Sequence, residues 1–244
     1  MKNILVPTTL ESDTLNAVKL AIQQTKGKKC TIILLLINEI PDTDASTAFL
    51  RNMKSVHSFS QKKVLENCWK LVEAETDCIL KIHHQYGISA PMMKNLMKFL
   101  SVDFTILIPS YKNADKKIHK QFTQILSNCK CPILHSCSTF EQQDFTAAMY
   151  LEQAKSKLHV EDLHELIPED FNLKIVSQAK LFQDQNPEDL QSLLHEAILK
   201  NKINLLIETR KPKKIILKKM PKTSAENFGL PVLSLYEELV WGFK

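Results

Sequence analysis

Two lysine-rich segments are the parts of this sequence best suited to binding an anion. Residues 108–122 read IPSYKNADKKIHKQF, and residues 208–228 read ETRKPKKIILKKMPKTSAENF. A phosphate-binding loop uses backbone N–H groups that glycine leaves most accessible, and no glycine occurs between Gly87 and Gly229. Lysine, in contrast, binds phosphate as a point charge. An anion site here would therefore depend on side chains: Lys112, Lys116 and Lys117 in the first segment, or Arg210, Lys211, Lys213 and Lys214 in the second.

The histidines and cysteines form no pattern typical of a metal or nucleophilic site. His83 and His84 are adjacent in an expected strand, so their side chains point to opposite faces. The C-x-C pair at residues 129–131 has no second cluster at a spacing suited to zinc. No nucleophile turn or oxyanion loop accompanies the residues that could supply a nucleophile and a base, namely His119, His135 and Cys137. We therefore expect no enzyme, no metal and no cofactor.

Alternating apolar runs and amphipathic stretches predict an α/β fold in the first half of the chain. Residues 30–38, CTIILLLIN, are apolar almost throughout, which is typical of a strand buried on both faces of a parallel sheet. Helices are expected over residues 13–25, ended by Gly27, and over residues 45–75. Five strands joined by helices indicate a doubly wound sheet, because right-handed crossovers place helices on both faces. The other four strands are expected at 3–8, 78–84, 104–109 and 132–136.

The second half repeats this pattern in a shorter form. Residues 81–137 and 174–236 each read as strand, helix, strand, helix, strand. The second half as a whole offers four strands, near 145–151, 172–178, 203–209 and 231–236. We therefore predict two doubly wound parallel sheets in tandem, in domains 1–138 and 145–244, the second shortened by one βα unit. Pairing of their last strands, 132–136 and 231–236, would remove two exposed sheet edges.

Composition limits the location and the partners of the chain. No apolar run among the 244 residues reaches the length of a membrane span, and the N-terminus lacks the apolar region of a signal peptide. We therefore expect a cytoplasmic protein, no membrane partner and six free thiols. The basic run at 210–222 has no interleaved aromatic residue to stack on bases, which argues against nucleic acid and favours a solvated helix face. The apolar tail at 239–244 is expected to dock on its own chain or on a second copy.

Several motifs in the first half resemble those of universal stress proteins. The opening ILVPTTLESDTLNAVKLA is similar to the family's first strand and helix, and LLLINEIPD to its second strand. Gly87 falls where the family has a glycine after the third strand, and CPIL at 131–134 resembles its closing strand. The match covers residues 1–138 well and 170–236 weakly. It implies the adenine nucleotide alpha hydrolase-like fold, often in tandem copies, and a bacterial stress-response role.

The chain departs from this family at the positions that hold ATP. ATP-binding members carry an aspartate directly after V-P-T, where this chain has a threonine, and a glycine-rich loop after the fourth strand. We therefore interpret the chain as a non-catalytic, regulatory stress protein that has lost ATP binding and acts by protein association, with itself or with an unknown protein. The alternative is a sensor that still binds an adenine nucleotide or another small anion through its lysine-rich loops. The degenerate positions that would then take part are Thr9, Gly87, Ser110, Tyr111 and Lys112.

Overall fold

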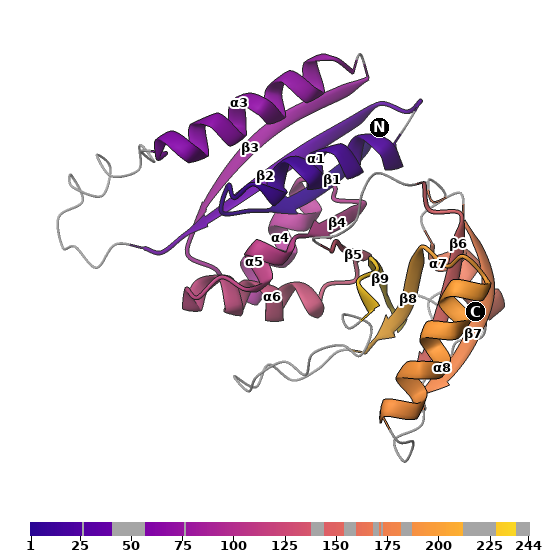
Figure 1. Cartoon of the computed structure of the whole chain (residues 1–244). Coiled ribbons are helices and arrows are strands. Elements are labelled where there is room, and N and C mark those ends of the chain that lie inside the picture. The colour runs from indigo at the N-terminus through magenta and orange to yellow at the C-terminus, as the bar shows by residue number, and fades with distance from the viewer. Residues whose placement is uncertain are drawn as a thin grey trace, which may run out of the picture.

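A computed structural model gives the arrangement of most of the chain (Figure 1). The residues that it describes are 1–25, 27–40, 57–75, 77–137, 144–153, 160–167, 171, 173–181, 187–211 and 228–237. Most of the expected linker, the first part of the expected helix at 45–75, the basic run beyond residue 211 and the apolar tail lie outside these residues.

The described strands form one sheet in the order β3-β2-β1-β4-β5-β9-β8-β6-β7. Neighbouring strands are parallel throughout, except that β5 and β9 are antiparallel. The bounds are β1 (Lys2–Pro7), β2 (Cys30–Asn38), β3 (Cys78–Tyr86), β4 (Phe104–Leu107), β5 (Ile133–His135), β6 (Ala147–Gln153), β7 (Lys174–Leu181), β8 (Leu205–Arg210) and β9 (Val232–Tyr236).

Helices cover both faces of the first five strands, as right-handed crossovers require. In Figure 1, α1 and α3 pack together on one face, while α4, α5 and α6 lie on the other. The described helices are α1 (Asp13–Gln24), α3 (Phe59–Glu73), α4 (Ala90–Phe99), α5 (Pro109–Lys112), α6 (Lys117–Ser127), α7 (Val160–Leu166) and α8 (Pro187–Lys200). None of them is long and apolar enough to cross a membrane.

The core is built around β2, whose residues Cys30–Ile37 are all buried. Its continuous apolar run matches this position, because β1 and β3 flank it and helices cover the sheet. The end of α1 also follows the sequence expectation: Gly27 has a φ of +81°, a left-handed conformation that glycine adopts without strain.

The α/β class is confirmed, but the two predicted sheets are joined edge to edge into one. The expected pairing of the two last strands is confirmed, since Ile133, Leu134 and His135 of β5 lie opposite Ser234, Leu233 and Val232 of β9. In the described second half, β7 lies beside β6 as β2 lies beside β1. The sequence repeat instead aligned β7 with β3. The outer place that β3 takes in the first half therefore has no described counterpart.

Arg210, at the end of β8, links the second half of the chain to the first by hydrogen bonds. Its Nε donates to the carbonyl of Ser127 at 3.1 Å, and its Nη2 to the carbonyl of Cys129 at 2.9 Å. Further hydrogen bonds run to the carbonyls of Cys131 and Ser234. Burial lowers the pKa of this guanidinium to about 10, although nearby acidic groups and the thiols of Cys129 and Cys131 act in the opposite direction. These contacts direct the donors of Arg210 to backbone carbonyls, which argues against the anion-binding role considered from the sequence.

Candidate functional site

A cavity of about 700 Å³ lies at the carboxyl ends of β1 and β4. These two parallel neighbours lead to α1 on one face and α5 on the other, so they form the switch point at which open α/β sheets bind ligands. The volume falls within the range of small-molecule sites. The cavity is lined by Thr9, Glu11, Ser12, Asp13, Gln61, Ser110, Ala114, Asp115, Lys116 and His119.

A carboxylate occupies the hydrogen-bond donors at the start of α5. The backbone N–H of Ser110 donates to Oδ2 of Asp13 at 2.9 Å, and its hydroxyl donates to Oδ1 of the same residue at 2.7 Å. Asp13 is the first residue of α1 and Ser110 the second residue of α5, so the contact joins the two helices across the cavity. Asp13 is not recognisable as a site residue from the sequence, because an acidic residue in the first turn of a helix is usual for that helix alone, here α1.

The loop between β1 and α1 is held in place by its threonines and by α3. Thr8 accepts a hydrogen bond from the N–H of Leu10 at 2.8 Å, and its hydroxyl contacts that of Thr14 at 2.6 Å. Gln61 donates to the carbonyl of Thr9 at 3.1 Å. The side chain of Gln61 also completes a capping box with Ser58, so the start of α3 is fixed against this loop. Side chains from the loop after β1, from α1 and from α3 thus hold the cavity wall by hydrogen bonds.

The charges around the cavity favour a cation over an anion. Its acidic side chains are Glu11, Asp13 and Asp115, and its lysine is Lys116. The pKa of His119 is lowered, because burial outweighs the opposing hydrogen bond to Ile37 and Lys116 adds to the lowering, so His119 is mainly neutral at neutral pH. Its Nε2 contacts the carbonyl of Ile37 at 3.3 Å, and since a carbonyl only accepts, Nε2 carries the proton.

Only part of the predicted nucleotide site meets at this cavity. Thr9 and Ser110 line it, and so does Lys116 from the lysine-rich segment. The side chain of Tyr111 is buried away from solvent against His119 and Phe122, with ring centroids 4.9 and 5.7 Å away. Burial also raises the pKa of the Tyr111 hydroxyl. Tyr111 is therefore a core residue, which argues against a direct contact with a ligand in this cavity.

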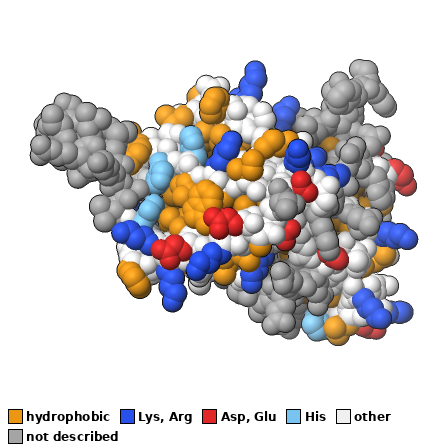
Figure 2. Space-filling model, turned by 90° about the horizontal axis from the view of Figure 1, so that it is seen from above, with side chains coloured by type: hydrophobic (Ala, Val, Ile, Leu, Met, Phe, Trp, Pro, Cys, Tyr) orange, Lys and Arg blue, Asp and Glu red, His pale blue; other side chains and the backbone are white. Residues whose placement is uncertain are grey.

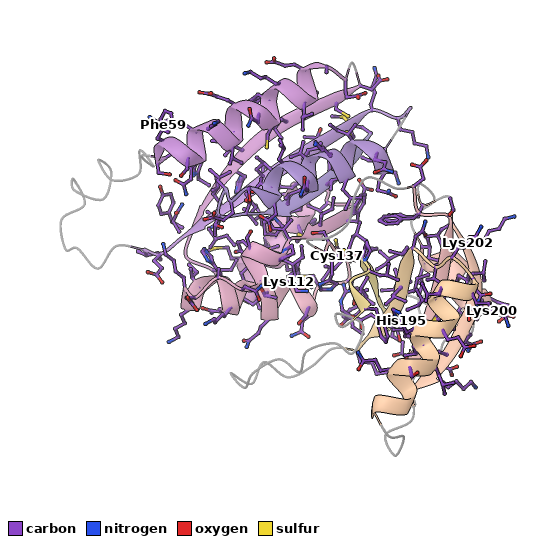
Figure 3. All side chains as sticks on the ribbon, viewed as in Figure 1. Phe59, Lys112, Cys137, His195, Lys200 and Lys202 are labelled. Atoms are coloured by element: carbon purple, nitrogen blue, oxygen red, sulfur yellow. The ribbon has the colours of Figure 1, made fainter. Side chains whose placement is uncertain are left out.

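Two other predicted positions, Gly87 and Lys112, are not among the residues that line the cavity. Gly87 follows β3 with a φ of +66°, and its N–H donates to the carbonyl of Asn38 at 2.9 Å. Its role is therefore to turn the chain between β3 and α4. Lys112 is the last residue of α5 (Figure 3). Of the lysines expected to form a second anion site, Lys211 pairs with Glu237 at 3.3 Å, and Lys213 and Lys214 lie outside the described residues.

The cysteines and histidines of the described residues form no metal-binding group. No group of three or more His, Cys, Asp or Glu side chains within the described residues is placed to hold a metal ion. His84 stacks on His57 with ring centroids 5.8 Å apart. Burial raises the pKa of the Cys131 thiol to about 12, and Cys137 contacts the carbonyl of Gly229 at 3.1 Å. The Cys131 thiol is therefore protonated at neutral pH, and the Cys137 thiol contacts the backbone.

Comparison with known proteins places the fold. No protein-family model matches the chain, and no curated protein is similar to it in sequence. Among solved structures, a universal stress protein from Archaeoglobus fulgidus superposes with a TM-score of 0.55 at 9% identity, over 96% of each chain. A functionally unknown protein from Pseudomonas aeruginosa, PA1789, gives a TM-score of 0.49 at 13% identity, over 98% of this chain and 94% of that one. The chain therefore has the α/β fold of universal stress proteins, and its resemblance to them is confirmed at the level of the fold.

Proposed function

We propose that this chain is a non-catalytic regulatory protein of the universal stress type, which no longer binds ATP and acts by association with other proteins. The proposal includes the two domains, 1–138 and 145–244, and a cytoplasmic location. The observation that carries it is the hydrogen bonding of Asp13 to Ser110, where a phosphate would need free donors.

The carboxylate of Asp13 opposes a phosphate in two ways. It already accepts hydrogen bonds from the N–H and the hydroxyl that start α5. It also repels the phosphate charge: two unit charges about 4 Å apart repel by about 4 kcal/mol at an effective dielectric constant of about 20. That energy corresponds to roughly a thousandfold loss of affinity. Glu11 on the same wall adds to the repulsion.

The backbone after β4 gives a second reason. In this segment, Pro109 has no N–H, and Ser110 and Tyr111 carry side chains where glycines would let phosphate oxygens approach. The ring of Tyr111 is packed in the core against Phe122, so a shift of this segment would disturb core packing. A nucleotide would have to break this packing to reach the backbone.

One observation favours the alternative of an anion sensor. Lys116 lines the cavity and precedes α6, so its ammonium is placed to meet a small anion entering there. A thermal-shift titration separates the two functions, because a bound ligand raises the melting temperature by mass action. We expect no shift with millimolar MgATP. A concentration-dependent rise that is lost in Lys116→Ala would favour the sensor.

Association with other proteins is supported by large apolar side chains on the surface. Phe59 is 86% exposed at the start of α3, and Phe99 is 81% exposed at the end of α4. Figure 3 shows Phe59 at the outer end of its helix, away from the sheet. Hydrophobic side chains also gather beside histidines on the face seen in Figure 2. Light scattering tests self-association: a dimer that becomes a monomer on deletion of residues 239–244 would assign the interface to the apolar tail.

A further inference from the structure

Cys30 and Cys78 bring their thiols into direct contact at one end of the sheet. Cys30 is the first residue of β2 and Cys78 the first residue of β3. The two lie opposite each other in the parallel register, and their Sγ atoms are 2.8 Å apart. Cys30 has no exposed surface, whereas Cys78 is half-buried. The Cys78 side of the pair is therefore accessible to solvent, whereas Cys30 is shielded from it.

We propose that Cys30 and Cys78 are an oxidation site, at which a hydroperoxide converts the two thiols into a reversible disulfide. The bond would link β3, which lies at the edge of the sheet, covalently to β2. It would also close a loop over residues 30–78 that carries α3, the helix that supplies Gln61 to the cavity.

The backbone already has the spacing that a disulfide needs. Neighbouring strands lie about 4.7–4.9 Å apart, which is within the range of about 4.4–6.8 Å between the Cα atoms of bonded cysteines. Because the residues are in register and their Sγ atoms are already 2.8 Å apart, the bond requires only a short further approach of the two sulfurs. Other thiols contact different groups: Cys129 and Cys137 lie within 3.5 Å and 3.1 Å of the backbone carbonyls of Ile125 and Gly229, respectively.

The reaction consumes one hydroperoxide. The thiolate of Cys78 attacks one peroxide oxygen and breaks the O–O bond, so that hydrogen peroxide gives a sulfenic acid on Cys78 and one water. The sulfur of Cys30 then attacks the sulfur of Cys78, the S–O bond breaks, and a second water leaves with the proton of Cys30. Two thiols lose two electrons, and the peroxide gains them.

The surroundings of Cys78 set the rate. Burial raises its pKa to about 12, helped by its hydrogen bond with Cys30 and by the charge of Glu75, while a hydrogen bond with Thr25 lowers it. The reactive thiolate is therefore a minor species at neutral pH. As long as the pH stays below that pKa, the thiolate fraction rises about tenfold for each unit by which the pH is increased, and the oxidation rate rises with it.

Peptide mapping of the oxidised full-length chain tests the proposal. Native protein is treated with hydrogen peroxide at pH 7, 8 and 9, and remaining thiols are blocked before trypsin digestion. Cleavage at lysine and arginine puts Cys30 in the peptide 30–51 and Cys78 in the peptide 71–81, and each contains no other cysteine. We expect these two peptides linked, with a mass about 2 Da below their sum, and separated again by dithiothreitol.

Variants and stability complete the test. Cys78→Ser should abolish the link, whereas the control Cys137→Ser should leave it unchanged. Closing a loop of this length should raise the melting temperature of the oxidised wild type by roughly 5–15 °C, an increase that Cys30→Ser lacks. Absence of the 30–51/71–81 link after native oxidation, whether or not other cysteines pair, overturns the proposal. So does a link that forms only after the protein is denatured.

Discussion

Replacing Arg210 should destabilise the whole chain, because this side chain bonds both halves at once. Its guanidinium donates to the carbonyl of Ser127 at the end of α6, to those of Cys129 and Cys131 just after that helix, and to that of Ser234 in β9. The last carbonyls of a helix have no partner within it, so Arg210 supplies what the helix cannot. Arg210→Met removes the charged donor and leaves these buried carbonyl oxygens without it.

The expected loss follows from the number of acceptors left unsatisfied. A hydrogen bond to a charged group contributes about 1.5–3 kcal/mol, and breaking a buried charged cluster costs about 3–5 kcal/mol in total, because such contributions do not add fully. We therefore expect Arg210→Met to lower the free energy of unfolding by about 3–5 kcal/mol and the melting temperature by about 10 °C. Arg210→Lys should lose roughly half as much, since lysine keeps the charge but lacks the planar fork.

Urea denaturation followed by circular dichroism measures this loss. Lys200→Met is a matched control, because Lys200 is exposed at the end of α8 and its replacement should change the free energy of unfolding by less than about 0.5 kcal/mol. If Arg210→Met is no less stable than that control, the guanidinium does not join the two halves.

Further predictions concern pH and one turn. Burial, with the charges of Lys112 and Arg210, holds the pKa of His135 well below its usual range, so the unfolded state binds more protons than the folded state below about pH 6.5. Stability should therefore fall as the pH drops through that value, by up to about 1.4 kcal/mol per unit, and His135→Leu should flatten the fall in denaturant titrations. Gly87→Ala should cost about 1 kcal/mol, because its φ is +66° and the new Cβ would lie 2.7 Å from Cδ1 of Ile40. Gly27→Ala, at a φ of +81° with open space around it, measures the backbone part alone in the same melts.

The order of elements in the first half is readable from the sequence, because local patterns determine it. The apolar run of β2 indicates a buried strand, and the glycine after α1 indicates the end of a helix; each signal is contained within a few residues. The pairing of β5 with β9 is also predictable, since two equivalent edge strands remain after the repeats are recognised. The merging of two sheets into one follows from this pairing.

The cavity is less predictable, because its main contact joins distant residues. Asp13 and Ser110 are 97 positions apart, and neither belongs to a motif that indicates the other. Arg210 lies 83 positions from Ser127, and its place in a basic run suggests an anion as its binding partner rather than backbone carbonyls. The position of Tyr111 after β4 suggests a place near the site, whereas the turn of α5 directs its ring into the core. Such contacts depend on how whole elements cross, which local patterns do not encode.

Isothermal titration of the wild-type chain with MgATP tests the loss of nucleotide binding most directly. The Asp13 carboxylate and the glycine-free segment after β4 predict no binding heat at concentrations up to the millimolar range. Asp13→Asn, which keeps the size of the side chain and removes its charge, shows whether repulsion contributes: any affinity should rise relative to wild type. Stoichiometric binding of MgATP by the wild type below about 100 μM, equivalent to about 5–6 kcal/mol, would contradict the proposed loss of ATP binding.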